Sequence, residues 1–232
     1  MSQARTAALA GALYVALDIV VGVTAGAPPP PAAPEGEIVT YLADHRAGLA
    51  AGLWLFGLAT LPLLWWFGSL WDLMIRAEEG APRLAVVSLA GLLLGGTMSL
   101  GSAAAMATLA LLPPNTGGAL ALYAFAAMSL SAAGFGLAAH LIATNVLAAR
   151  SRMLPRWLVA TGLVSAAAFL ISAVLGALTA DAISNTVSLV GFVLWLAWIL
   201  DVSYRMYNPA QHAQQISESP AASGTLSSER RR

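Results

Sequence analysis

Two ionisable side chains lie within stretches of sequence that are otherwise apolar, and they are the first candidates for chemistry. Asp18 lies in the run that follows Arg5, and His140 lies in residues 136–145, which read GLAAHLIATN. Ionisable residues at membrane depth are costly and mark functional sites by default. A carboxyl beside an imidazole could bind a ligand or pass a proton, whereas the alternative is a hydrogen-bonded clamp that only fixes how helices pack. We favour the clamp.

Two further polar residues could complete a cluster with this pair. Counted from the ends of their stretches at about 1.5 Å per residue, Asp18 lies about 18 Å deep and His140 about 15 Å deep. Tyr14 lies one helical turn before Asp18, and Thr97 reaches a comparable depth in its own stretch. We therefore expect an intramembrane polar cluster, for binding or proton handling, made of Asp18, His140, Tyr14 and Thr97.

A second, weaker candidate site lies in the first loop. Residues 37–42 could form a short helix on the membrane surface, with the side chains of Ile38, Tyr41 and Leu42 dipping into the membrane. The charged residues around it could bind a cation or a lipid headgroup; they are Glu37, Asp44, His45 and Arg46. The alternative, which we favour, is a solvated loop that starts the next helix.

Metal and cofactor chemistry find little support in the sequence. There are no cysteines, which excludes thiolate metal sites and disulfides. A b-type haem generally needs two deep histidines, but His45 lies at the expected membrane boundary and His212 lies in the tail. No Walker loop, metalloprotease motif or nucleophile elbow is present. We expect no metal and no cofactor, and we favour a protein that is not an enzyme.

The elements that must position these residues are membrane helices. Hydrophobic residues make up 59% of the chain and charged residues 9%, far from the balance of a soluble domain. Six stretches are long enough to cross a bilayer as helices. They are residues 6–26, 47–71, 84–112, 119–149, 157–180 and 184–206. The sequence thus predicts an all-α, polytopic, six-transmembrane-helix bundle over residues 1–207, and residues 208–232 read as a disordered cytoplasmic tail.

The arginines predict how the bundle is oriented. All but Arg46 fall at the two termini or in the second and fourth connections. By the positive-inside rule, both termini are cytoplasmic and the proline-rich first loop lies outside. The first helix also resembles a secretory signal, but its length, Asp18 and the proline after residue 27 favour an uncleaved helix.

Small residues and tryptophans indicate how the helices pack. Gly91 and Gly95 have the four-residue spacing that lets membrane helices approach closely. The seven tryptophans are expected mostly at the membrane boundaries. Two helix ends also repeat a pattern of Asp and Arg four residues apart, which predicts paired interface anchors: Asp72 with Arg76, and Asp201 with Arg205.

Several short motifs resemble those of a known family. They are Tyr41 with the DHR of residues 44–46, the IRAEEG of residues 75–80 and the RMLPRWL of residues 152–158. Together they resemble actinobacterial-type integral membrane proteins that are described only as a domain of unknown function. The resemblance extends to about Tyr207. It implies a six-helix fold in the plasma membrane and supplies no catalytic residues.

The sequence therefore favours a non-enzymatic binding or accessory component of the bacterial plasma membrane. Its expected partners are the lipid bilayer and a protein or apolar ligand, and the net charge of +0 argues against nucleic acid. One alternative is a small proton-coupled transporter that uses Asp18 and His140. Another is an intramembrane enzyme that acts on a lipid or other apolar substrate. The sequence does not indicate an oligomeric state.

Overall fold

Six long apolar helices form the body of the protein, and a short helix lies across one end. The computed structural model describes residues 3–112, 118–178 and 182–207, and this part of the chain contains no strand. Its helices are α1 (Gln3–Ala25), α2 (Glu35–Asp44), α3 (Arg46–Ala77), α4 (Arg83–Leu111), α5 (Ala119–Ser151), α6 (Arg156–Leu178) and α7 (Ala182–Tyr207). All except α2 are long and apolar enough to cross a membrane. The predicted six-helix, all-α membrane bundle is confirmed.

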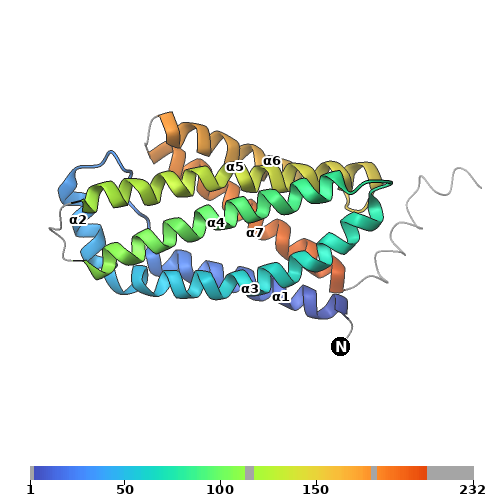
Figure 1. The fold of residues 1–232 in the computed structure, drawn as a ribbon, viewed down its shortest axis with the longest axis horizontal. Helices are drawn as coiled ribbons and strands as arrows, with labels where there is room; N and C mark the ends of the chain where they lie inside the picture. The colour runs from blue at the N-terminus through green and yellow to red at the C-terminus, as the bar shows by residue number, and fades with distance from the viewer. Residues whose placement is uncertain (1–2, 113–117, 179–181, 208–232) are drawn as a thin grey trace, which may run out of the picture.

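The six spanning helices form a closed ring in chain order. Each packs against the spanning helix before it and the one after it, and α7 returns to pack against α1 (Figure 1). Because consecutive spanning helices run in opposite directions, α1 begins and α7 ends at the same end of the bundle. Side chains from all six helices fill the interior.

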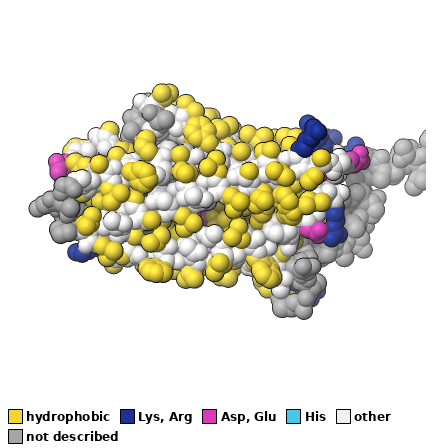
Figure 2. Space-filling view, in the orientation of Figure 1, with side chains coloured by type: hydrophobic (Ala, Val, Ile, Leu, Met, Phe, Trp, Pro, Cys, Tyr) yellow, Lys and Arg dark blue, Asp and Glu magenta, His cyan; other side chains and the backbone are white. Residues whose placement is uncertain are grey.

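The two ends of the bundle differ in charge. Basic side chains gather at the end where the chain begins and where α7 stops, whereas hydrophobic side chains cover the body between the ends (Figure 2). We call these the arginine-rich end and, opposite it, the α2 end. Which of them faces the cytoplasm stays a prediction. The predicted tail, residues 208–232, lies outside the described residues.

Helices α4 and α5 approach each other closely, through glycine. A Cβ atom on Gly91 would lie 2.6 Å from the carbonyl oxygen of Gly136 and 2.6 Å from the backbone nitrogen of His140. A Cβ on Gly95 would lie 3.1 Å from the carbonyl oxygen of Ala133. Lipid offers no hydrophobic drive for helices to associate, so this close backbone contact supplies van der Waals attraction instead. It also fixes which face of α4 meets α5.

The interior of the ring is aromatic, which corrects an expectation about tryptophan. Trp66 and Trp198 are fully enclosed and pack edge to face with ring centroids 6.0 Å apart, and Trp195 is 4% exposed. These three were expected at the membrane boundaries because they lie within a few turns of helix ends. Their faces of α3 and α7 point into the ring, and that orientation decides their burial.

Candidate functional site

Asp18 is held inside the ring by its neighbour on α1. The Tyr14 hydroxyl donates a hydrogen bond of 2.7 Å to Oδ2 of Asp18, four residues later and therefore on the same helix face. Asp18 is 3% exposed and Tyr14 is 2% exposed. The Tyr14 ring packs edge to face against Trp195 of α7, with centroids 5.6 Å apart. The predicted pairing of these two residues is therefore present in the structure.

His140 belongs to a separate hydrogen-bonded group between α4 and α5. Its Nδ1 lies 2.9 Å from the hydroxyl of Ser88 and 3.3 Å from the Ser88 carbonyl oxygen. The Ser88 hydroxyl lies 2.9 Å from that of Thr144, which donates back to the carbonyl oxygen of His140 at 2.8 Å. All three residues are fully buried.

The hydrogen-bonding pattern of this group favours one tautomer of His140. A carbonyl can only accept, so the contact with the Ser88 carbonyl oxygen favours a hydrogen on Nδ1. In that arrangement Thr144 donates to the His140 carbonyl, and Ser88 donates to Thr144 and accepts from Nδ1. The Nε2 atom is then a bare acceptor. It is buried and has no hydrogen-bond partner in the described part of the chain.

Asp18 and His140 lie at different depths. Gly11 of α1 lies against Trp66, Trp66 packs on Trp198, and Trp198 packs on His140 with ring centroids 6.2 Å apart. Gly11 and His140 thus flank the same tryptophan pair, and Asp18 lies seven residues, or about 10 Å, beyond Gly11 toward the α2 end.

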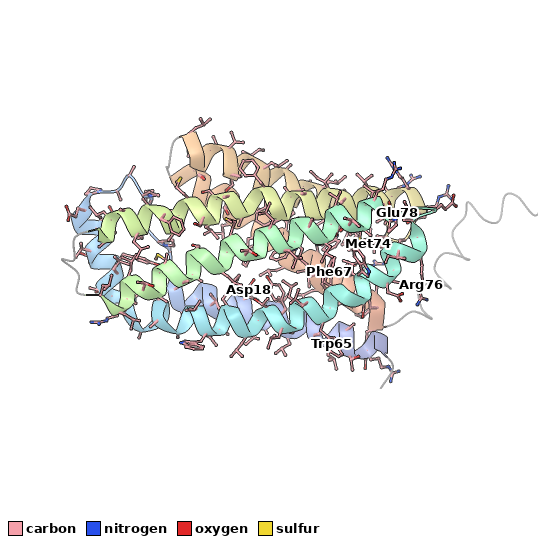
Figure 3. The ribbon with its side chains drawn as sticks, viewed as in Figure 1. Asp18, Trp65, Phe67, Met74, Arg76 and Glu78 are labelled. Atoms are coloured by element: carbon pink, nitrogen blue, oxygen red, sulfur yellow. The ribbon has the colours of Figure 1, made fainter. Side chains whose placement is uncertain are left out.

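Figure 3 agrees with this separation. Asp18 lies midway along the bundle, whereas Phe67, whose ring centroid is 5.6 Å from that of His140, lies toward the arginine-rich end. The expected meeting of Asp18 and His140 is wrong in this structure, because α1 and α5 are not neighbours in the ring and each residue has its own partner.

Thr97 also lies outside the expected cluster. It is exposed on the surface of α4, because the α5-facing side of that helix is set by Gly91 and Gly95, and Thr97 is rotated about 200° from Gly95. Ser88 takes the place that was expected for Thr97. It lies three residues before Gly91, so the small-residue spacing contained the signal that could have identified it.

At the α2 end, residues of the first loop hydrogen-bond to the backbone at the ends of α4 and α1; we call these contacts the loop clamp. Arg46 Nε donates to the carbonyl oxygen of Ala110 at 2.6 Å, and Tyr41 donates to the carbonyl oxygen of Ala25 at 2.9 Å. These carbonyls lie in the last turns of α4 and α1, where no helical donor follows. Gly26 has φ +67°, and a Cβ there would lie 2.5 Å from Nε2 of His45. The loop clamp therefore closes the α2 end over the ring.

The acidic residues of this loop take no part in the loop clamp. Glu37 and Asp44 are exposed, and the described residues contain no group of three or more acidic or histidine side chains that could hold a metal ion. Ile38, Tyr41 and Leu42 are buried against Leu49, Leu109 and Tyr123, so this helix face packs on protein instead of dipping into lipid. Burial raises the pKa of Tyr41 to about 12, so Tyr41 keeps its proton and donates.

A half-open cavity lies at the α2 end of the bundle. It has a volume of about 100 Å³ and is lined by residues of α4, α5, α6 and α7 together with Pro28, Pro29 and Pro31. The Tyr123 hydroxyl donates to the carbonyl oxygen of Pro29 and so ties the proline segment to α5. We call this cavity the vestibule.

The lining of the vestibule is mostly apolar and includes serines from four helices. These are Ser102, Ser131, Ser172 and Ser188, and their side chains make no hydrogen bond with the part of the chain that the structure describes. No family model, curated protein or solved structure matches the chain.

The chemistry of the vestibule indicates what it could bind. Free hydroxyls both donate and accept hydrogen bonds and carry no charge, so they suit a small uncharged polar ligand.

Sequence reasoning missed the vestibule because its residues were interpreted as packing positions. Ser172 and Gly176, for example, have the four-residue spacing that favours close helix contact. The signal that could have identified the site is the presence of serines in the same end of four consecutive helices. Their convergence depends on closure of the ring.

Proposed function

We propose that this protein is a non-enzymatic binding component of the bacterial plasma membrane that holds a small, uncharged, hydroxyl- or carbonyl-bearing ligand in the vestibule. The observation that supports this proposal is the cavity of about 100 Å³ lined by four serines whose hydroxyls have no partner within the described residues. Polar groups inside a membrane protein are usually hydrogen-bonded, and a ligand would give these hydroxyls partners.

The position of the vestibule suits this role. It lies at the α2 end, which the arginine distribution predicts to be outside, so a ligand would enter from the external face past the proline segment. The bond between Tyr123 and Pro29 would then hold this entrance shut over a bound ligand. The motifs shared with the family of unknown function accord with a plasma-membrane protein but name no ligand.

The two alternatives remain predictions with less support. A proton-coupled transporter that uses Asp18 and His140 as a direct pair requires contact between them, and their separate partners give no route for proton transfer. An intramembrane enzyme would use Asp18 as an acid with Tyr14 or His140 assisting; Tyr14 lies beside Asp18, but neither residue lines the vestibule. Binding is therefore the function that the geometry supports best.

Saturation-transfer NMR with glycerol and acetamide as probes tests the proposal. Full-length protein should give saturable signals with at least one probe, and the triple variant Ser102→Ala, Ser131→Ala, Ser188→Ala should lose them. Serine-to-alanine changes keep the shape of the cavity and remove its hydroxyls. The control is Ser69→Ala on α3, outside the vestibule, which should bind as the parent does. Equal signals from the triple variant and the parent would contradict the proposal.

A further inference from the structure

A hollow in the side of the bundle lies next to the buried Asp18. The ribbons of α3 and α4 lie close together near both ends and farther apart midway along their length (Figure 1). The space-filling view shows a hollow at this place, with acidic atoms at its floor (Figure 2). In the described chain, Asp18 is the acidic residue that lies midway along the bundle, and Figure 3 places it between α3 and α4.

The carboxyl of Asp18 has one oxygen free. Oδ2 accepts from Tyr14, and Oδ1 has no partner in the described residues and is not fully enclosed. The residue as a whole is 3% exposed, so the free oxygen is reached through a narrow approach. Such a carboxyl oxygen can accept a further hydrogen bond or pair with a cation.

No positive charge from the described chain compensates Asp18. The two ion pairs, Asp72 with Arg76 and Asp201 with Arg205, both lie at the arginine-rich end. The titratable neighbour of Asp18 is Tyr14, and His140 lies on the other side of the Trp66–Trp198 pair. A carboxylate at this depth costs several kcal/mol, and a bound cation would offset that cost.

The side chains near Asp18 indicate which chemical class of cation could bind there. The Tyr14 ring packs on Trp195, which also contacts Phe192 with ring centroids 6.0 Å apart. Aromatic faces attract organic ammonium groups, whereas a bare metal ion would need more oxygen ligands than one carboxyl and one phenol. Since the hollow opens on the apolar side of the bundle, the ligand must also be soluble in lipid.

We propose that Asp18 binds an organic ammonium ion with an apolar body, which enters from the bilayer between α3 and α4. This site is distinct from the vestibule and uses none of its residues. The Asp18 carboxylate pairs with the ammonium, Tyr14 holds the carboxylate in place, and the aromatic side chains contact the apolar body.

Binding of benzyltrimethylammonium tests the proposal, because its charge does not depend on pH. Equilibrium dialysis of the full-length protein in detergent should give saturable binding, and Asp18→Asn should weaken it by at least about tenfold. Asparagine keeps the size of the side chain and an oxygen for Tyr14. The matched control Asp201→Asn, at the membrane boundary, should bind as the parent does. Equal binding by Asp18→Asn, or no saturable binding by the parent, overturns the proposal.

Chemical labelling of the parent protein tests the lateral route without any variant. Dicyclohexylcarbodiimide, which dissolves in lipid and reacts with carboxyl groups, should label Asp18 in native membranes, and benzyltrimethylammonium should reduce that labelling. A water-soluble carbodiimide should leave Asp18 unlabelled. Mass spectrometry of the peptides locates the label. Absence of label on Asp18, or label unaffected by the cation, overturns the proposal. The serine variants of the vestibule should behave as the parent in both experiments.

Discussion

Ser88 of α4 and His140 of α5 are joined side chain to side chain, with the serine hydroxyl 2.9 Å from Nδ1, at a point where both residues are fully buried. The same hydroxyl lies 2.9 Å from that of Thr144. This contact lies next to a close backbone approach of the two helices, at Gly91. Hydrogen bonding and backbone packing therefore stabilise the same pair of helices at the same depth.

The tautomer of His140 is the first prediction. Because Nδ1 faces a carbonyl oxygen and Nε2 faces none, ¹⁵N NMR of the histidine ring should find Nδ1 protonated and Nε2 bare. Selective ¹⁵N labelling of histidine resolves the two nitrogens. A ring protonated at Nε2 alone would contradict the hydrogen-bond order that runs from His140 through Ser88 to Thr144.

The second prediction is that Ser88→Ala destabilises the protein by about 1 kcal/mol, the scale of hydrogen bonds between membrane helices. The variant removes the central hydroxyl of the group and leaves the carbonyl oxygen of residue 88 as the Nδ1 partner, at 3.3 Å. The matched control is Ser129→Ala, a buried serine of α5 whose side chain has no hydrogen bond in the described chain. Unfolding in mixed detergent micelles measures both. Equal losses would mean that the hydrogen bonds of Ser88 do not contribute.

A third prediction concerns the glycines of α4. Gly91→Ala places a methyl group 2.6 Å from backbone atoms of α5, which cannot move aside as a side chain could. The helices must separate, and we expect a loss of about 1–3 kcal/mol. Gly96→Ala has open space around the added methyl group and should leave stability unchanged or slightly raised. Thermal unfolding in detergent compares the two variants, and a Gly96→Ala loss as large as that of Gly91→Ala would argue against close packing as the cause.

The fourth prediction uses the pKa of Tyr41. Burial raises this pKa to about 12, so the unfolded phenol ionises first as the pH rises. The stability that the buried neutral phenol contributes is therefore complete below about pH 10 and is lost by about pH 12. The unfolding temperature of Tyr41→Phe should fall less steeply over that range than that of the parent. Tyr204→Phe, in which an exposed tyrosine is replaced, should follow the parent curve.

The two ion pairs at the arginine-rich end give a fifth prediction. Arg76 and Asp72 have side chains 74% and 58% exposed, whereas those of Arg205 and Asp201 are 16% and 26% exposed. Water screens the first pair, so Asp72→Asn should cost at most about 0.5 kcal/mol. Asp201→Asn should cost more, about 1 kcal/mol, and its effect should be less sensitive to salt. Unfolding at low and high salt separates the two. Equal costs would contradict a role for burial.

Much of the fold could be predicted from the sequence because each feature is local. The length of an apolar stretch predicts a spanning helix, and Gly91 with Gly95 predicts a close contact whatever the partner. The buried face of α2 also follows from the spacing of Ile38, Tyr41 and Leu42 within one short helix. None of these inferences depends on which helices are neighbours in the bundle.

The candidate site could not be predicted to the same extent because it depends on helix order and rotation. Depths counted from helix ends placed Asp18 and His140 together, but their helices are not neighbours in the ring. Thr97 and Ser88 lie on opposite sides of α4, and the contact with α5 decides which of them is inside. Trp66 and Trp198 are buried for the same reason.

The closure of the ring has a consequence for biosynthesis. Because the chain leaves the ribosome in N-to-C order, α1 is made before its partner α7. Until α7 has been translated, the face of α1 that carries Tyr14 and Asp18 has no contact with Trp195. The nascent chain therefore carries a polar residue of α1 without this neighbour until α7 joins the bundle.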